Sequence, residues 1–115
     1  MAKIINSARN IALAENYVLC ETVFSKFMGL MLSTNRKKSL VFVFKKERLI
    51  SLHMFFVFYP IDVLFIDKRK IIVEIKENFM PFTFYTSKKQ AMYVMELPDK
   101  IIKKTRTGIG DKIEF

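Results

Sequence analysis

Two side chains in the middle of the chain, His53 and Asp62, are of types that could do chemistry together. They bracket the stretch HMFFVFYPID, in which Val, Ile, Phe and Tyr favour β-strands and Pro60 favours a corner. If the two strands are antiparallel neighbours, the Asp62 carboxylate could orient the His53 imidazole for general base catalysis. The alternative is structural: a histidine at a strand end, and a buried aspartate that accepts backbone N–H groups at the corner.

No motif marks a nucleophile that would complete such a catalytic site. Cys20 is the only cysteine, and the chain has no G-x-S-x-G sequence, Walker loop or dinucleotide fingerprint. A small hydrolase or transferase that uses His53 and Asp62 therefore ranks third among the functional hypotheses. We expect no cofactor.

Metal binding has little support from the residue types. A single His and a single Cys exclude a histidine cluster and a cysteine-based zinc site. Asp62, Glu96 and Asp111 carry the oxygen ligands that Mg²⁺ or Ca²⁺ prefers, but they are scattered and lie in no loop signature. We expect these three carboxylates to make structural hydrogen bonds, and we predict no metal site.

Residues 49–66, LISLHMFFVFYPIDVLFI, are apolar enough to raise the question of a membrane helix. Such a helix needs about 20 predominantly apolar residues, and a central Asp62 would cost about 2.5–3.5 kcal/mol on insertion scales. Two buried strands joined at Pro60 avoid that cost. We therefore predict strands here and no transmembrane segment.

The N-terminal sequence MAKIINSARNIALAEN lacks the uninterrupted apolar stretch of a signal peptide. A single cysteine also fits a reducing compartment. Together these features predict a cytoplasmic location.

Short apolar runs alternate with turn residues along the rest of the chain. Strands are predicted at 40–44, 49–56, 61–67, 71–75, 91–97 and 112–115, with shorter strands before residue 20 and an edge strand or bend around Pro81. Residues 22–32 predict a helix with Thr22 as N-cap, and Asp99 is predicted to cap a short helical turn at 100–105. The pattern predicts one domain over residues 1–115, mainly β: a compact β-sandwich or distorted barrel of about eight short strands with one side-packed α-helix and a short helical turn.

The net charge of +9 would attract nucleic acid, anionic lipid or acidic partners, although basic residues in loops can also serve only solubility. A nucleic-acid surface would combine basic loops with exposed aromatic rings for base stacking. The candidate nucleic-acid contacts are Arg36, Lys37, Lys38, Lys68, Arg69 and Lys70. Further basic clusters are Lys45, Lys46 and Arg48, then Lys88 and Lys89, and then residues 100–106.

Short motifs in a fixed order run through nearly the whole chain: GLM at 29–31, FVF at 42–44, HM at 53–54, YPIDVLFID at 59–67, ELP at 96–98 and GD at 110–111. In this order they resemble the uncharacterised domain of unknown function 192 family (UPF0127-like). The resemblance implies a compact β-rich sandwich or barrel with a helix at its side, and no established activity. The chain departs from many relatives where they have Lys-Asn-Thr (here Phe55-Phe56-Val57), Arg (here Ser33) and Gly (here Lys100).

Together these features favour a non-enzymatic binding or interaction domain for an unknown small ligand or protein. Its cleft is predicted near the His53/Asp62 corner, and the candidate ligand-binding residues are His53, Met54, Asp62 and Glu96. A basic nucleic-acid-binding module is the first alternative, and the small hydrolase or transferase is the second.

Overall fold

The apolar runs form strands in the structure, a computed structural model that describes residues 3–21, 39–54 and 58–115. The strands are β1 (Ile4–Asn6), β2 (Ile11–Ala14), β3 (Val18–Cys20), β4 (Leu40–Arg48), β5 (Ser51–His53), β6 (Ile61–Ile66), β7 (Ile72–Phe79), β8 (Phe84–Thr86), β9 (Ala91–Pro98) and β10 (Ile113–Glu114), and the short helix α2 spans Ile101–Thr105. The predicted mainly-β fold is therefore confirmed.

A five-stranded sheet in the order β3-β4-β9-β6-β7 forms the middle layer. Its neighbours are antiparallel except for β3, which runs parallel to β4. Strand β6 is buried along its whole length, which explains its unbroken apolar sequence. A buried strand of this kind needs cover on both faces of its sheet.

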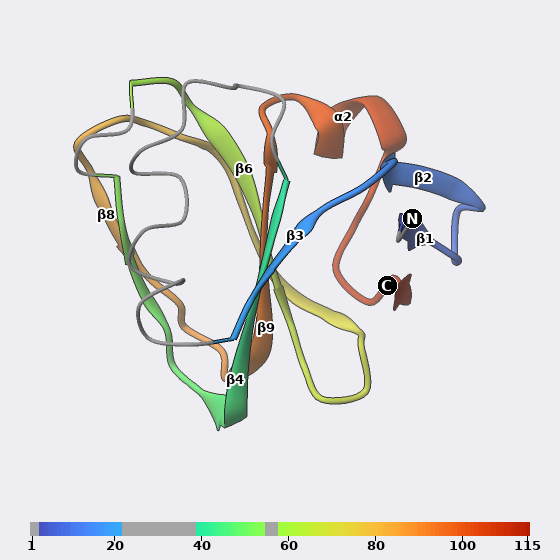
Figure 1. The fold of residues 1–115 in the computed structure, drawn as a ribbon, viewed down its shortest axis with the longest axis horizontal. Helices are drawn as coiled ribbons and strands as arrows, with labels where there is room; N and C mark the ends of the chain where they lie inside the picture. Colours follow the sequence, from blue (N-terminus) through green and yellow to red (C-terminus); the bar gives the residue numbers. More distant parts are fainter. Residues whose placement is uncertain (1–2, 22–38, 55–57) are drawn as a thin grey trace.

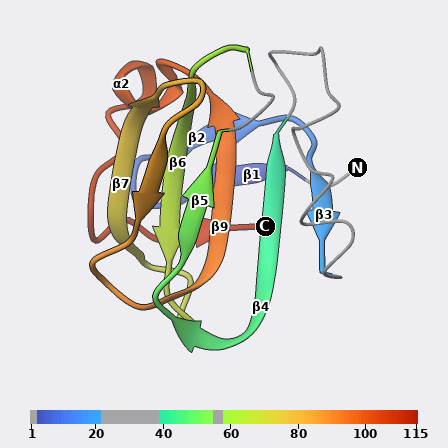
Figure 2. The same ribbon diagram turned by 90° about the vertical axis from the view of Figure 1, so that its left-hand side faces the viewer.

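Two smaller sheets and the helix supply that cover (Figures 1 and 2). The pair β5-β8 lies over one face, which we call the β5–β8 face, and packs on Val63 and Phe65. The sheet β10-β1-β2 and helix α2 lie over the other face, which we call the α2 face, and pack on Leu64 and Ile66. The alternation along β6 thus divides the interior into two apolar clusters.

Some predicted elements differ from the observed ones, and one lies outside the described residues. The helix predicted at 22–32 belongs to the part of the chain that the structure does not describe. The predicted helical turn is present as α2, but the predicted Asp99 cap is wrong. Lys100 occupies the N-cap position in a left-handed conformation (φ 73°) and makes no side-chain capping bond.

The apolar run at 49–66 contributes β5 and β6. Among the described residues, no helix is long and apolar enough to cross a membrane.

Candidate functional site

Asp62 lies near the start of β6 and points to the α2 face of the central sheet. Its Oδ1 accepts a hydrogen bond from the backbone N–H of Asn78 (3.0 Å), and its Oδ2 accepts one from Ile102 (3.1 Å). Because Ile102 is in the first turn of α2, Asp62 satisfies a helix N–H that would otherwise lack a partner. The buried Asp62 therefore joins the end of β7 to the start of α2.

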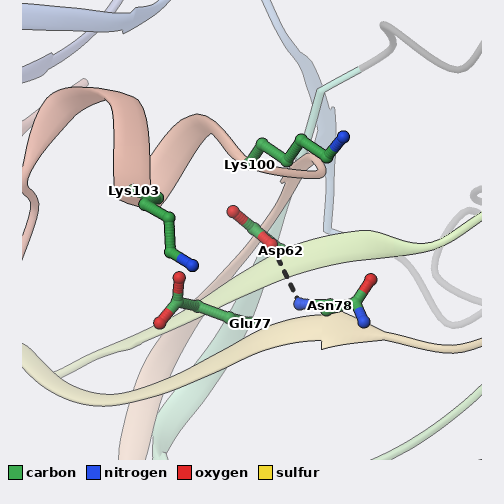
Figure 3. Close-up of a pocket in the computed structure, with 5 residues that line it drawn as sticks. All are labelled: Asp62, Glu77, Asn78, Lys100 and Lys103. Atoms are coloured by element: carbon green, nitrogen blue, oxygen red, sulfur yellow. Dashed lines mark hydrogen bonds between the residues drawn. The ribbon is translucent and has the colours of Figure 1, made fainter.

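A pocket of about 350 Å³ opens beside this junction (Figure 3). Its lining consists of Asp62, Glu77, Asn78, Lys100 and Lys103. Figure 3 shows the ammonium group of Lys103 pointing toward the Glu77 carboxylate across the pocket. The lining thus includes two lysines, two carboxylates and a side-chain amide, and the Lys100 ammonium group points away from Lys103 and Glu77 in Figure 3.

The backbone on two sides of this pocket is left-handed at residues other than glycine. Asn78 has φ 51° and Lys100 has φ 73°. Asn tolerates this conformation well, whereas Lys does so at a cost. A glycine, which the family resemblance implies at this position in many relatives, would fit this backbone without strain.

His53 ends β5, and its backbone pairs with Phe84 of β8. These two strands cover the β5–β8 face of the central sheet, whereas the Asp62 side chain is on the α2 face. A His53–Asp62 catalytic pair stays a prediction.

Met54 and Glu96, the other two candidate ligand residues, belong to the β5–β8 side of the molecule. Met54 is fully buried in the apolar cluster of that face. Glu96 lies in β9 between Leu40 and Val63 of the neighbouring strands. Burial among these side chains raises the pKa of Glu96 to about 8. The structure therefore separates Asp62 from Met54 and Glu96 by the thickness of the sheet.

Asp111 is the third carboxylate considered as a metal ligand, and it serves a different structural junction. Its Oδ2 accepts hydrogen bonds from Asn6 Nδ2 (2.9 Å), Gly108 N (2.9 Å) and Arg9 Nε (3.2 Å). Desolvation opposes ionisation, but these donors prevail and hold the pKa of Asp111 below its usual value. Within the described ranges, no three His, Cys, Asp or Glu side chains are arranged to hold a metal ion.

The basic residues Lys68, Arg69 and Lys70 form the turn between β6 and β7. Asp67 Oδ1 accepts the N–H groups of Arg69 (2.9 Å) and Ile71 (3.1 Å), which fixes the turn. Arg36, Lys37 and Lys38, the other predicted nucleic-acid contacts, lie outside the described residues.

Three basic segments meet at one end of the central sheet, at the bottom of Figure 1. The Glu47 carboxylate of β4 accepts the N–H of Lys68 (2.8 Å), and Glu74 accepts the N–H groups of Lys88 (2.8 Å) and Lys89 (2.9 Å). We call this surface the basic end; it comprises Lys45, Lys46, Arg48, Lys68, Arg69, Lys70, Lys88 and Lys89. Of these side chains only Arg69 forms an ion pair with a described residue. The Glu47 and Glu74 carboxylates thus accept hydrogen bonds from backbone N–H groups and do not pair with the described basic side chains. Most of the lysine and arginine side chains of the basic end therefore remain exposed to solvent.

Sequence reasoning did not predict Glu77, Asn78 or Lys103 as site residues. They come from β7 and α2, and only the docking of α2 against Asp62 brings them together. The one local signal was Lys100, which departs from the glycine of many relatives.

The sequence of this chain is similar to those of uncharacterised proteins. The family model of DUF192, an uncharacterised ACR family, matches residues 5–115. A UPF0127 protein of Thermococcus sibiricus is 34% identical over 97% of this chain and 73% of its own length. A UPF0127 protein of Pyrococcus abyssi is 30% identical over 100% of this chain and 98% of its own length.

Two solved structures have a similar fold. A Sinorhizobium meliloti protein superposes with a TM-score of 0.85 at 24% identity, covering 97% of this chain and 89% of its own. A Novosphingobium aromaticivorans protein of unknown function has a TM-score of 0.84 at 18% identity, covering 98% of this chain and 82% of its own.

Proposed function

The chain belongs to the DUF192 family of uncharacterised proteins, and we propose that it is a non-enzymatic binding domain whose site is the pocket beside Asp62. The observation that carries the proposal is the pocket itself. It has the volume of a small-molecule site, and charged residues of β6, β7 and the start of α2 line it.

The pocket lining favours binding over catalysis. Among the described residues that line it, no Ser, Thr, Cys or His side chain is present to act as a nucleophile or as a general base near neutral pH. Asp62, a buried acidic group of the lining, already accepts two backbone hydrogen bonds and holds α2 in place. These groups suit recognition of a ligand better than its conversion.

The ligand that fits this lining is a small polar molecule with an anionic group. Lys100 and Lys103 can donate charge-assisted hydrogen bonds to a carboxylate or phosphate. Glu77 and the Asn78 amide can accept or donate further hydrogen bonds and so orient the rest of the molecule.

A thermal-shift screen of small carboxylates and phosphate esters tests this function, because a ligand raises the melting temperature by mass action on the folded state. Lys100→Gly combined with Lys103→Ala removes both ammonium groups and relieves the left-handed backbone at residue 100. We expect the variant to fold and to bind a stabilising compound at least about tenfold more weakly, since each charge-assisted hydrogen bond contributes about 1.5–3 kcal/mol.

Lys104→Ala is the matched control, because Lys104 is an exposed lysine of the same helix that does not line the pocket. If the double variant and this control bind the compound equally well, the pocket is not the site.

A second candidate function is nucleic-acid binding through the basic end. The specific observation is that three basic segments gather at one end of the sheet while the acidic groups there accept backbone hydrogen bonds. The Sinorhizobium meliloti protein that shares this fold is described as a "putative transcription regulator". That description suggests nucleic acid as the class of partner, and the positive charge of the basic end suits such a partner.

Binding of a short DNA or RNA at increasing salt tests this second candidate. Affinity should fall steeply with salt. The double variant Lys68→Ala with Lys88→Ala should have a lower affinity for the nucleic acid. In a plot of the logarithm of affinity against the logarithm of salt concentration, its slope should also be smaller by about one for each phosphate that a lysine no longer neutralises. Lys103→Ala, at the other end of the sheet, serves as the control. No binding even at low salt would exclude the function.

A cytoplasmic location is part of the proposal. Its support is the presence of one cysteine in the whole chain, which fits a reducing compartment. Cell fractionation tests it, and recovery in the membrane pellet would contradict it.

A further inference from the structure

Three phenylalanine side chains are exposed on the side of the molecule where β8 lies. The exposed fractions are 74% for Phe58, 53% for Phe82 and 69% for Phe84. Large aromatic side chains are usually buried, and an exposed group of them marks an interaction surface. The rings of Phe58 and Phe82 are in edge-to-face contact with centroids 5.4 Å apart, so residues from two separate segments form one patch.

Strand β8 connects this patch to the basic end. Phe84 and Thr86 are exposed, whereas Tyr85 between them packs into the apolar cluster of the β5–β8 face. The alternation therefore places Phe84 and Thr86 on the outer surface. Lys88 follows two residues later, and its backbone is held by Glu74.

Hydroxyl groups lie between the aromatic patch and the lysines. Ser51 of β5 pairs with Thr86, and their hydroxyl oxygens are 2.9 Å apart on the exposed surface. The backbone rises about 3.3 Å per residue in a strand, so Phe84 and Thr86 are about 7 Å apart along β8, and Lys88 follows just beyond the end of the strand. The surface thus runs from aromatic rings through hydroxyl groups to ammonium groups.

The geometry points to a binding track for single-stranded nucleic acid, with bases stacked on Phe58, Phe82 and Phe84 and phosphates held at Lys88 and Lys89. This inference rests on the second candidate function, the basic end as a nucleic-acid surface, and it goes further by naming the strandedness and the base contacts. A duplex keeps its bases stacked on one another, so only a single strand can place them on exposed rings.

The charge of the neighbouring surface argues for a nucleic acid as the occupant of the patch. An apolar protein partner could pack on Phe58, Phe82 and Phe84, but it would carry no charge to pair with the adjoining lysine ammonium groups. Single-stranded nucleic acid complements both, because every base has a face that stacks and every nucleotide carries a phosphate.

The test compares a labelled single-stranded oligonucleotide with the duplex of the same length by fluorescence anisotropy. Wild-type protein should bind the single strand more tightly. Phe84→Leu removes the aromatic ring but keeps an apolar side chain, and it should weaken single-strand binding about tenfold, since stacking contributes about that factor per base, while duplex binding stays unchanged. Phe84→Tyr keeps the ring and should restore binding.

Ile109→Ala is the matched control, because Ile109 is 68% exposed but lies in the loop after α2, away from the patch. Melting temperatures confirm that each variant is folded. If Phe84→Leu and Phe58→Leu bind the single strand as well as wild type does, the stacking inference is wrong.

The same experiment separates this inference from the function on which it rests. Suppose that Lys88→Ala with Lys89→Ala weakens binding of both the single strand and the duplex, while the Phe variants change the affinity for neither. The basic end then binds nucleic acid, and only the inference of a single-strand track is refuted. If wild-type protein binds neither ligand, both fail.

Discussion

Five carboxylic side chains are buried among the described residues: Asp62, Asp67, Glu74, Glu96 and Asp111. Four of them accept at least two hydrogen bonds each, from backbone N–H groups or from polar side chains. Glu96 accepts none from the described part of the chain, and its neighbours across the sheet are Leu40 and Val63. Desolvation without compensation is the physical reason that its pKa rises to about 8.

This environment predicts a dependence of stability on pH at a single residue. Because the folded-state pKa of Glu96 is raised from 4.5 to about 8, its neutral form stabilises the fold. That stability is complete below pH 4.5 and is lost as the pH rises toward 8. At pH 7 the loss is on the order of 3 kcal/mol, since each pKa unit corresponds to about 1.4 kcal/mol.

Glu96→Gln should therefore be more stable than wild type at pH 7 and should show a flatter dependence on pH between 5 and 8. Urea unfolding across that range measures both quantities. Glu114→Gln, an exposed glutamate of β10, is the control and should leave the wild-type profile intact. A wild-type profile retained in Glu96→Gln would contradict the assignment.

Among the secondary-structure elements, α2 depends on a residue far away in the sequence. A helix of five residues is too short to be stable alone, so tertiary contacts must hold it. Asp62 supplies one through the N–H of Ile102, and the side chain of Ile102 is buried against the α2 face. At the other end of the helix, the left-handed Arg106 donates its N–H to helix carbonyl groups.

Replacement of Asp62 tests this dependence. Asp62→Ala should lower the free energy of unfolding by about 2 kcal/mol, because it leaves the buried N–H of Ile102 and the part-buried N–H of Asn78 without their carboxylate partner. Hydrogen exchange at those two amides should accelerate. Asp99→Ala is the matched control and should change stability by less than about 0.5 kcal/mol, because Asp99 does not cap the helix. Equal losses in the two variants would refute the role of Asp62.

Some of the secondary-structure elements could be predicted from the sequence, and others could not. The period-two alternation and the unbroken apolar run of β6 predicted strands that the structure contains. Local spacing also predicted the turn of helix after Pro98, but it assigned the cap to Asp99, the nearest acidic residue. The true partner, Asp62, is 40 residues earlier in the chain. Local signals cannot identify it, because only the pairing of β6 with β9 brings it to the helix.

The candidate site was predictable to a similar degree. Pro60 and Asp62 marked the corner where the pocket lies, but Glu77 and Lys103 carry no local signal of their own. Whether His53 takes part stays a prediction. Glu96 belongs to the opposite face of the sheet, because Asp62 pairs with its neighbour Leu97 and a one-residue step along a strand reverses the direction of a side chain. Met54, which follows β5, packs on that opposite face.

Across the molecule as a whole, the two proposed surfaces lie at opposite ends of the central strands. The pocket is near the start of β6 and the end of β7, whereas the basic end includes the turn that joins these strands. A packed five-stranded sheet separates them (Figure 1). Both surfaces carry lysine side chains, but with different neighbours.

This separation makes the two functions independently testable. Lys103→Ala should weaken binding in the pocket and leave nucleic-acid affinity unchanged, and Lys68→Ala should do the reverse. Parallel titrations of both variants with both kinds of ligand measure this. A single variant that abolishes both activities would contradict the separation.

A site-resolved NMR titration of the backbone amides decides whether the pocket beside Asp62 binds anions, because an anion could otherwise bind at the basic end and mimic pocket binding. With inorganic phosphate, or with a carboxylate that stabilises the fold, we expect saturable shifts of the Asn78, Ile102 and Lys103 amides. These shifts should be lost in Lys100→Gly with Lys103→Ala and kept in Lys104→Ala. Saturable shifts at Lys68, Lys88 and Lys89 alone, with the pocket amides unmoved, would contradict pocket binding.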